Sequence, residues 1–186
     1  MNVNDRRVRK TKKALIEALA SLMMKKELHN ITIKELTDTA DIHRATFYSH
    51  YEDIYDMYKK VEDSVINELD NILVINQTYT YEDIYKSIVN YVYNNSMLCL
   101  MFLSKNSNIK FKNRICELIE KKYLNIWLHE DGKTEITKEM QYIATYHVQG
   151  CIAIISHWIE SDFSYSKELI IELLRKIDIN IEKINL

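Results

Sequence analysis

Proline and glycine, the two residues that most often interrupt helices, are almost absent from this sequence. Its 186 residues include no proline and only two glycines, Gly132 and Gly150. The turns of a sheet protein usually depend on these residues, whereas helix interiors exclude them. Nearly half of the residues are apolar, so the chain can bury a core of its own. Together these features predict an all-α fold.

Long apolar stretches and targeting signals are also missing. The longest apolar run, Met97–Leu103, has seven residues, whereas a membrane-spanning helix needs about 20. The first 13 residues are polar and basic, without the apolar centre of a secretory signal. We therefore expect a cytoplasmic protein without a membrane partner.

Groups of residues typical of catalytic and metal sites are not apparent. The three cysteines, Cys99, Cys116 and Cys151, are an odd number at wide spacing among apolar neighbours, which favours reduced thiols in a core. No pairing of nucleophile and base, phosphate-binding glycine loop or metal-ligand cluster is evident. We therefore expect no catalytic residues, no metal and no cofactor.

Charge is distributed unequally along the chain. Residues 1–50 contain ten Lys or Arg against six Asp or Glu, whereas the remainder contains fifteen against twenty-one. Six of the eight residues from Arg6 to Lys13 are cationic. Such an asymmetry indicates a basic part that faces phosphate and an acidic part with another task. We expect the basic run to form a mobile arm that follows the DNA backbone or enters the minor groove.

Helical periodicity predicts three short helices in the first third of the chain. Apolar residues recur at helical spacing over 11–25. Thr32 and Glu35 fit a capping box that opens a second helix of about two turns. Asp41 tolerates a left-handed turn, and a third helix of about eight residues then starts near His43 or Arg44. This pattern predicts a helix-turn-helix module, which binds the DNA major groove through its last helix.

The two faces of that third helix differ in chemistry. Phe47 and Tyr51 are one turn apart and are expected to pack inward. On the other side, Arg44 can bind guanine, and Tyr48 and His50 can donate hydrogen bonds to phosphate. The candidate DNA-binding residues are Arg6, Arg7, Arg9, Lys10, Thr32, Lys34, Arg44, Ala45, Thr46, Tyr48 and His50.

Longer helices are predicted for the rest of the chain. Asp53 can cap a fourth helix that carries apolar residues at helical spacing as far as Leu73. Polar breaks then separate further helical patterns, which cover about 81–94, 97–104, 109–129, 137–161 and 166–184.

The segment Thr32–Tyr58 resembles the DNA-binding domain of the TetR family of transcriptional regulators. Its most specific part is the TFYSHY sequence at Thr46–Tyr51, followed by Asp53. With the first helix included, the resemblance covers residues 8–68. The segment from Tyr146 to Glu160 also resembles the C-terminal region of a TetR subgroup that includes activators of dihydroxyacetone kinase operons.

The resemblance implies a domain organisation and a set of partners. Residues 8–68 would form a three-helix helix-turn-helix domain, joined by the long fourth helix to a helical effector-binding and dimerisation domain, residues 69–186. The protein would be a homodimer that binds a double-stranded DNA operator. Its last two helices would form the dimer bundle, and its middle helices would enclose a small-molecule pocket whose occupation releases DNA.

Candidate residues follow for both functions of the second domain. Aromatic residues that can line an amphipathic pocket are Tyr85, Tyr91, Phe102, Tyr123, Trp127, Tyr142 and Tyr146. Candidate dimer residues are His147, Gly150, Cys151, Ile154, Trp158, Leu169 and Leu173. His147 and Cys151 also have a spacing that metal ligands use, but without a third ligand nearby we favour packing in a dimer interface or a pocket wall.

Four departures from the family pattern affect the expected contacts. Asp41 stands where the turn usually has glycine, and Thr37 stands where a close helix crossing usually has alanine. His43 replaces the usual small N-cap residue. Glu52 and Ile54 stand where lysine is common at the start of the fourth helix. We therefore expect DNA affinity to depend more on the N-terminal arm and on the residues Arg44–His50.

Two modes of regulation fit these observations. The leading hypothesis is a dimeric repressor that a small apolar or aromatic effector releases from a palindromic operator. The alternative is a TetR-like regulator, an activator included, that a protein partner controls through the C-terminal domain. A closed cavity would favour the first mode, whereas an exposed apolar patch outside the dimer interface would favour the second.

Overall fold

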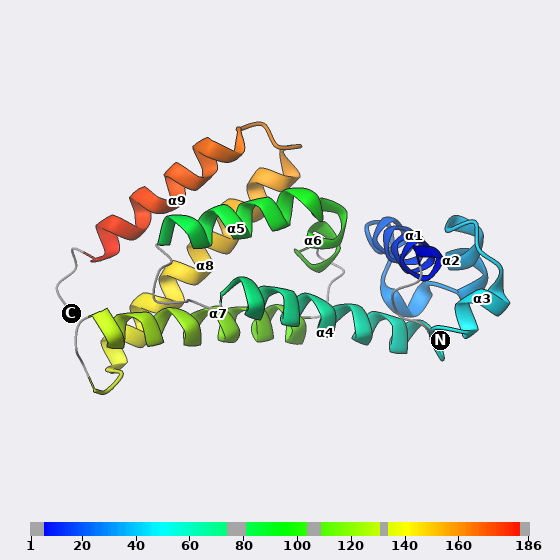
Figure 1. The fold of residues 1–186 in the computed structure, drawn as a ribbon, viewed down its shortest axis with the longest axis horizontal. Helices are drawn as coiled ribbons and strands as arrows, with labels where there is room; N and C mark the ends of the chain where they lie inside the picture. Colours follow the sequence, from blue (N-terminus) through cyan, green and yellow to red (C-terminus); the bar gives the residue numbers. More distant parts are fainter. Residues whose placement is uncertain (1–5, 74–80, 104–108, 131–133, 183–186) are drawn as a thin grey trace. The chain divides into compact units, whose positions relative to one another are not determined.

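The computed structural model describes residues 6–73, 81–103, 109–130 and 134–182 (Figure 1). These ranges contain α-helices, one short 3-10 helix and no strand, which confirms the all-α fold. None of the helices described is long and apolar enough to cross a membrane. Their bounds are α1 Arg6–Met23, the 3-10 helix Leu28–Asn30, α2 Ile33–Thr39, α3 Arg44–Tyr48, α4 Ile54–Ile72, α5 Tyr81–Asn94, α6 Ser96–Leu103, α7 Ile109–Glu130, α8 Lys138–Glu160 and α9 Lys167–Glu182.

The chain divides into two compact units, and the boundary falls within α4. The first unit contains the residues up to Ile66 together with Asn95–Ile109, and the second contains Asn67–Asn94 and the residues from Lys110 onward. The sequence placed α6 in the second domain, whereas the structure groups it with the first unit. The reason is that α6 is apolar at every position after Ser96, so it packs against α1 rather than presenting a polar face to water.

The first unit is organised around side chains that four helices bury completely. Leu19 of α1, Leu36 of α2, Phe47 of α3 and Met57 of α4 have no exposed surface. Burying a side chain of this size stabilises the fold by about 1.5–3 kcal/mol. This shared core fixes the short helices α2 and α3, which are too short to be stable alone.

Polar caps define where the helices of the first unit begin. The Thr32 hydroxyl accepts a hydrogen bond from the backbone N–H of Glu35 at 3.2 Å. The Glu35 carboxylate contacts the Lys26 ammonium. This lysine and, to a smaller extent, a hydrogen bond from the backbone N–H of Thr32 lower the pKa of the Glu35 carboxyl, so both bonds of the predicted capping box are present. Asp53 accepts from the backbone N–H of Asp56 at 2.7 Å, as predicted.

The turn before α3 has the left-handed residue that the sequence predicts. Asp41 has a φ of 53°, a conformation that aspartate adopts more easily than most residues other than glycine. The turn closes through a hydrogen bond from the backbone N–H of Ile42 to the carbonyl of Thr37, 3.0 Å long. Asp41 therefore maintains the helix-turn-helix geometry without the glycine that is usual in the family.

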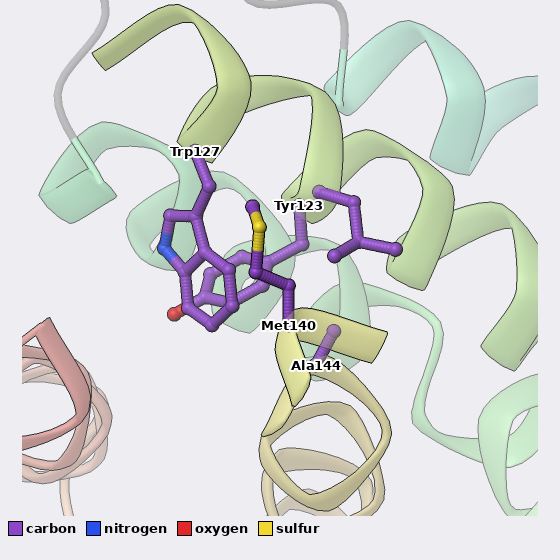
Figure 2. Packing of buried hydrophobic residues seen from close by; sticks show 5 residues of the cluster. Tyr123, Trp127, Met140 and Ala144 are labelled. Atoms are coloured by element: carbon purple, nitrogen blue, oxygen red, sulfur yellow. The ribbon is translucent and has the colours of Figure 1, made fainter. Parts of the chain in front are cut away.

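The second unit contains α5, α7, α8 and α9. Helix α9 packs against both α5 and α8 (Figure 1). Figure 2 shows Tyr123 and Trp127 of α7 beside Met140 and Ala144 of α8, and Ile177 of α9 packs against this cluster. Three consecutive helices thereby share one hydrophobic core.

A compact turn connects α8 to α9. Asp162 and Phe163 both have φ values above 50°. The Phe163 N–H donates to the carbonyl of Trp158 at 3.0 Å, and the Trp158 ring N–H donates to the carbonyl of Tyr165 at 2.8 Å. The rings of Trp158 and Phe163 pack edge to face at 4.8 Å. These contacts hold the turn at the break that the sequence predicts.

Candidate DNA-binding surface and buried cavity

Helix α3 presents one polar face above a buried aromatic residue. Arg44, Ala45 and Tyr48 are exposed, and Thr46 is half-buried, whereas Phe47 is completely buried. The helix ends at Tyr48, so it has five residues and not the eight predicted. The backbone N–H of Ser49 caps it by donating to the carbonyls of Ala45 and Phe47.

Aromatic packing fixes the orientation of the end of α3. The ring of Phe47 lies 5.6 Å from those of Tyr48 and Tyr51. Tyr51 is buried, with 5% exposed, whereas 56% of Tyr48 is exposed. The buried Phe47 ring therefore supports the Tyr48 ring, and the exposed part of Tyr48 is available to a partner.

His50 follows α3 and lies near two lysines. Partial burial, and then the charge of Lys12, lower the pKa of His50, which favours a neutral imidazole with one N–H donor and one acceptor nitrogen. The Lys60 ammonium donates to the carbonyl of His50 at 3.5 Å and lies 5.5 Å above the ring of Tyr51. The sequence did not single out Lys12 or Lys60, because helical spacing within α1 or α4 does not reveal that these lysines lie near His50.

The N-terminal basic run is helical and is not the mobile arm that we expected. Arg6–Lys13 forms the first turns of α1. Arginine and lysine are good helix formers, and nothing interrupts the pattern before the apolar residues of α1. The side chains of Arg6, Arg7, Arg9 and Lys10 are exposed, as are those of Thr32 and Lys34 at the start of α2. All candidate DNA-binding residues therefore lie on the first unit.

The second unit contains a cavity of about 70 Å³. Helices α5, α7, α8 and α9 and the residue after α4 supply its wall, and most of the side chains are aliphatic. They are Leu73, Ile84, Tyr85, Ile88, Ile119, Lys122, Tyr123, Ile126, His147, Val148, Cys151, Ile152, Ile155 and Leu174. The cavity is larger than a single water molecule requires.

Tyr85, Tyr123 and Cys151 of the cavity wall lie around His147, whereas Lys122 forms an ion pair with Asp70. The Nε2 atom of His147 lies 3.2 Å from the Tyr85 hydroxyl and 3.4 Å from Oδ1 of Asp178. The Tyr123 hydroxyl donates to the same Asp178 oxygen at 2.5 Å, and the Tyr123 ring stacks on the imidazole at 4.5 Å. His147 and Asp178 are almost completely buried. Four helices thereby bring one hydrogen-bonded group into the interior.

Burial controls the protonation of this group. It lowers the pKa of His147 to about 4, so the imidazole is neutral at pH 7. The imidazole therefore presents no positive charge to Asp178, whose Oδ1 atom lies 3.4 Å from Nε2. Burial also raises the pKa of Cys151 to about 12, so the thiol, whose sulfur lies 3.7 Å from Nε2, stays protonated. Among the side chains described, no group of three or more could hold a metal ion.

Only Tyr85 and Tyr123 of the seven predicted pocket residues line this cavity. The prediction that Tyr142 and Tyr146 line the pocket was wrong, because 77% and 73% of their surfaces are exposed. Helix α8 turns Ala144 and Val148 inward and these tyrosines outward. Phe102 is buried in the first unit against Tyr58. Trp127 packs in the cluster beside Tyr123 (Figure 2), and neither Trp127 nor Tyr91 lines the cavity.

The predicted dimer residues separate into buried and exposed sets. His147 and Trp158 are 4% and 2% exposed, and Cys151 lines the cavity, so these three belong to the interior of the chain. Ile154 is half-buried. The exposed members are Gly150, Leu169 and Leu173. Among the residues that the structure describes, and apart from the adjoining residues and backbone of α8 itself, no atom lies within 4 Å of the position that a Cβ on Gly150 would take, so this part of α8 is open.

Comparison with known families identifies the chain. Residues 79–178, more than half of the sequence, match the TetR_C_8 family, described as a transcriptional regulator C-terminal region. Among curated protein sequences, none matches this chain. Both the family and the solved structures that resemble this chain are transcriptional regulators rather than enzymes.

Solved structures share the fold over nearly the whole chain. The dihydroxyacetone kinase operon activator DhaS has a TM-score of 0.60 at 20% identity, covering 93% of this chain and 94% of its own. A TetR transcriptional regulator from Streptococcus agalactiae has the same score and identity, with coverages of 94% and 97%. FadR from Bacillus subtilis, solved in complex with stearoyl-CoA, has a TM-score of 0.57 at 13% identity, covering 87% and 96%. The matched C-terminal region and the shared fold agree: this chain belongs to the TetR family of transcriptional regulators.

Proposed function

We propose that this TetR-family regulator is a cytoplasmic homodimeric repressor that binds a palindromic operator and releases it when a small molecule occupies the cavity. The observation that carries the proposal is the exposed face of α3, which presents Arg44, Tyr48 and neighbouring residues above the buried Phe47. In this arrangement Arg44 reads a guanine edge, Ala45 and Thr46 contact a thymine methyl, and Tyr48 and His50 donate to phosphates.

The proposed DNA-binding domain, residues 8–68, also presents charge that suits phosphate. Arg6, Arg9 and Lys10 are exposed on the first turns of α1. The Thr32 hydroxyl and Lys34 lie at the start of α2, where backbone N–H groups favour anions. These contacts supply affinity without sequence preference, whereas α3 supplies the preference.

An apolar stripe on α9 and an open face of α8 support the homodimer. Leu169 and Leu173 are 51% and 43% exposed and lie four residues apart on α9. Tyr142, Tyr146 and Gly150 are exposed on α8. A second copy of the chain would cover these faces and form a four-helix bundle.

The cavity of the second unit supports control by a small molecule. It lies in the proposed effector domain, residues 69–186, and its wall is mainly aliphatic, as in most ligand sites. FadR from Bacillus subtilis was solved with stearoyl-CoA, and a regulator of similar fold that carries an acyl ligand agrees with this mode. The effector would shift the dimer toward a spacing of its two DNA-binding domains that does not fit the operator.

Selection of bound DNA from a random pool by the purified protein tests the DNA-binding part. We expect a palindrome whose half-sites are about one helical turn apart. Gel-shift titrations on the selected operator then compare variants. Arg44→Ala should weaken binding by about 1–3 kcal/mol and relax the preference at one base pair, whereas Tyr48→Ala should weaken binding to all sequences alike. Tyr165→Ala, an exposed tyrosine of the second unit, is the matched control.

Salt dependence tests the cations of α1. A double variant, Arg6→Gln with Arg9→Gln, should reduce the slope of log affinity against log salt by about 2 if each side chain contacts one phosphate. The control exchanges Lys121→Gln and Lys138→Gln, which are exposed on the second unit. An equal slope for both double variants would refute the phosphate contacts.

Light scattering after size-exclusion chromatography tests the dimer. Leu173→Glu places a charge on the exposed stripe of α9 and should give a monomer with weaker operator binding. Ile109→Glu changes a residue of the first unit that is 66% exposed, and it should leave the dimer intact. A Leu173→Glu protein that stays dimeric would exclude this face of α9 as the interface.

A further inference from the structure

A short bend, residues 49–53, connects α3 to α4 and contains His50. At its start, the backbone N–H groups of His50 and Tyr51 both donate to the carbonyl of Phe47, at 2.9 and 3.0 Å. At its end, the backbone N–H of Glu52 donates to the Asp56 carboxylate at 3.0 Å. The bend is therefore tied to α3 on one side and to α4 on the other.

The tie to α4 depends on an ion pair between Asp56 and Lys60. The Lys60 ammonium donates at 2.8 Å to Oδ2 of Asp56, the same oxygen that accepts from Glu52. Lys60, and then the backbone N–H of Glu52, lower the pKa of the Asp56 carboxyl, so this group is ionised at pH 7. Hydrogen bonds to a charged carboxylate are stronger than those between neutral groups, so Asp56 holds the end of the bend firmly.

The same ammonium also contacts the middle of the bend. Nζ of Lys60 lies 3.5 Å from the carbonyl oxygen of His50 and 5.5 Å from the centre of the Tyr51 ring. A cation over the face of an aromatic ring is attracted to it, and the Tyr51 ring packs on Phe47. One side chain of α4 thereby contacts the backbone of His50, the Tyr51 ring and the Asp56 carboxylate.

We propose that Lys60 is a positioning residue for DNA binding. It fixes the bend and, through the bend, the side chain of His50 that is proposed to contact a DNA phosphate. Lys60 acts on the bend rather than as a phosphate ligand, because Asp56 already neutralises its charge at 2.8 Å. This inference rests on the proposed function, because it treats His50 as a DNA contact.

Gel-shift titration on the selected operator tests the role of Lys60 with a matched neighbour. Lys59 and Lys60 are both exposed on α4, and exchange of either to methionine removes one charge but keeps a long apolar side chain. Lys60→Met should weaken operator binding about tenfold more than Lys59→Met, because the hydrogen bond from His50 to phosphate is misplaced. Equal affinities of the two variants would overturn the inference.

Urea titration of the same two variants confirms that the comparison concerns folded protein. An exposed ion pair contributes little to stability, so Lys60→Met should unfold at nearly the same urea concentration as Lys59→Met. A weaker affinity that disappears once the fraction of folded protein is taken into account would overturn the positioning role.

Salt dependence separates positioning from a direct phosphate contact. The two variants should have equal slopes of log affinity against log salt, because the loss of a neutral hydrogen bond releases no counterion. A slope reduced by about 1 in Lys60→Met alone would show that the ammonium itself binds a phosphate, and it would overturn the inference.

A double-mutant cycle tests whether Lys60 acts through His50. In a protein that already has His50→Ala, the further exchange Lys60→Met should cost much less than about tenfold, because residues that act together are not additive. A general structural effect of Lys60 would persist in both backgrounds. The same loss with and without His50→Ala would therefore overturn the inference.

Amide hydrogen exchange measured by NMR separates this inference from the proposed function, because it requires no DNA. Lys60→Met should speed exchange at His50 and Tyr51 relative to Lys59→Met, and the amides of α8 should not change. Faster exchange, together with unchanged operator binding by His50→Ala, supports the action of Lys60 on the bend and contradicts the proposed phosphate contact. Unchanged exchange, together with weaker binding by His50→Ala, supports the phosphate contact and overturns the positioning role.

Discussion

The two units of this protein bury polar groups in different ways. In the first unit, the buried Thr37 hydroxyl donates to the carbonyls of Ile33 and Lys34, within its own helix. In the second unit, the buried Asp178 of α9 contacts Tyr123 of α7 and His147 of α8. The first unit thus has its candidate DNA-binding residues on its surface, whereas the second unit brings its candidate ligand-binding residues together in its interior. This difference predicts that substitutions will separate DNA binding from ligand binding.

Phe47→Ala should have the largest effect and should act mainly on the first unit. Phe47 is completely buried under the face of α3, and removing such a side chain costs about 3–5 kcal/mol. Gel shifts should show loss of operator binding, and urea titration monitored by circular dichroism should show the lower stability. Calorimetry with hexan-1-ol, an aliphatic probe for the cavity of the second unit, should still detect ligand binding.

Met140→Ala is the counterpart in the second unit. Met140 is also completely buried, in the cluster of Figure 2, and its truncation should cost about 2–5 kcal/mol. Ligand binding should weaken, and operator binding should be retained at temperatures where the protein is folded. Loss of both activities in each variant would contradict the separation of the two units.

Acid should destabilise the protein through His147. Its folded pKa is about 4, below the ordinary value of 6.5, so the unfolded chain takes up a proton that the folded chain excludes. The exclusion of this proton contributes to the free energy of unfolding in full above about pH 6.5, and the contribution is lost as the pH falls toward 4. It amounts to about 3 kcal/mol. Urea titrations of the unmodified protein at pH 7 and pH 4 measure it.

His147→Phe isolates this contribution, because all other titrating groups remain. Its free energy of unfolding should change less between pH 7 and pH 4 than that of the unmodified protein. His157→Phe, at an exposed site, should keep the full dependence. Equal pH dependence in the three proteins would show that the imidazole is not held neutral by burial.

Most of the helices could be predicted from the sequence, because their signals are local. Thr32, Asp41 and Asp53 mark caps and a left-handed turn, and each occupies the expected place. The prediction of a mobile N-terminal arm was wrong, because the positive charge of this run indicates an affinity for phosphate but does not determine the conformation of its backbone. Arg6–Lys13 continues the helix that the apolar residues of α1 begin.

Tyr123→Phe should lower stability by a smaller amount. It removes the hydroxyl that donates to the buried carboxylate of Asp178, and the loss of such a partner costs about 1.5–3 kcal/mol. Urea titration at pH 7 measures the change, with the exposed Tyr165→Phe as control. A loss no greater than that of the control would mean that Asp178 does not depend on this hydroxyl.

The cavity could be predicted only in part, because its chemistry depends on packing between distant helices. Aromatic composition indicated Tyr85 and Tyr123 but also Tyr142, which helix α8 directs outward. Asp178 was not predicted, since an acidic residue on an amphipathic helix is usually solvated. No local pattern shows that it lies opposite His147.

Two threonine N-caps, one in each unit, provide the smallest and most closely matched test. Thr32 accepts from the backbone N–H of Glu35 at 3.2 Å, and Thr137 accepts from that of Met140 at 3.1 Å. Either exchange to alanine should cost about 1 kcal/mol of stability. Only Thr32→Ala should also weaken operator binding, because its hydroxyl is proposed to contact phosphate. Equal DNA affinity in the two variants, measured by gel shift at a temperature where both are folded, would restrict Thr32 to a structural role and leave DNA recognition to α1 and α3.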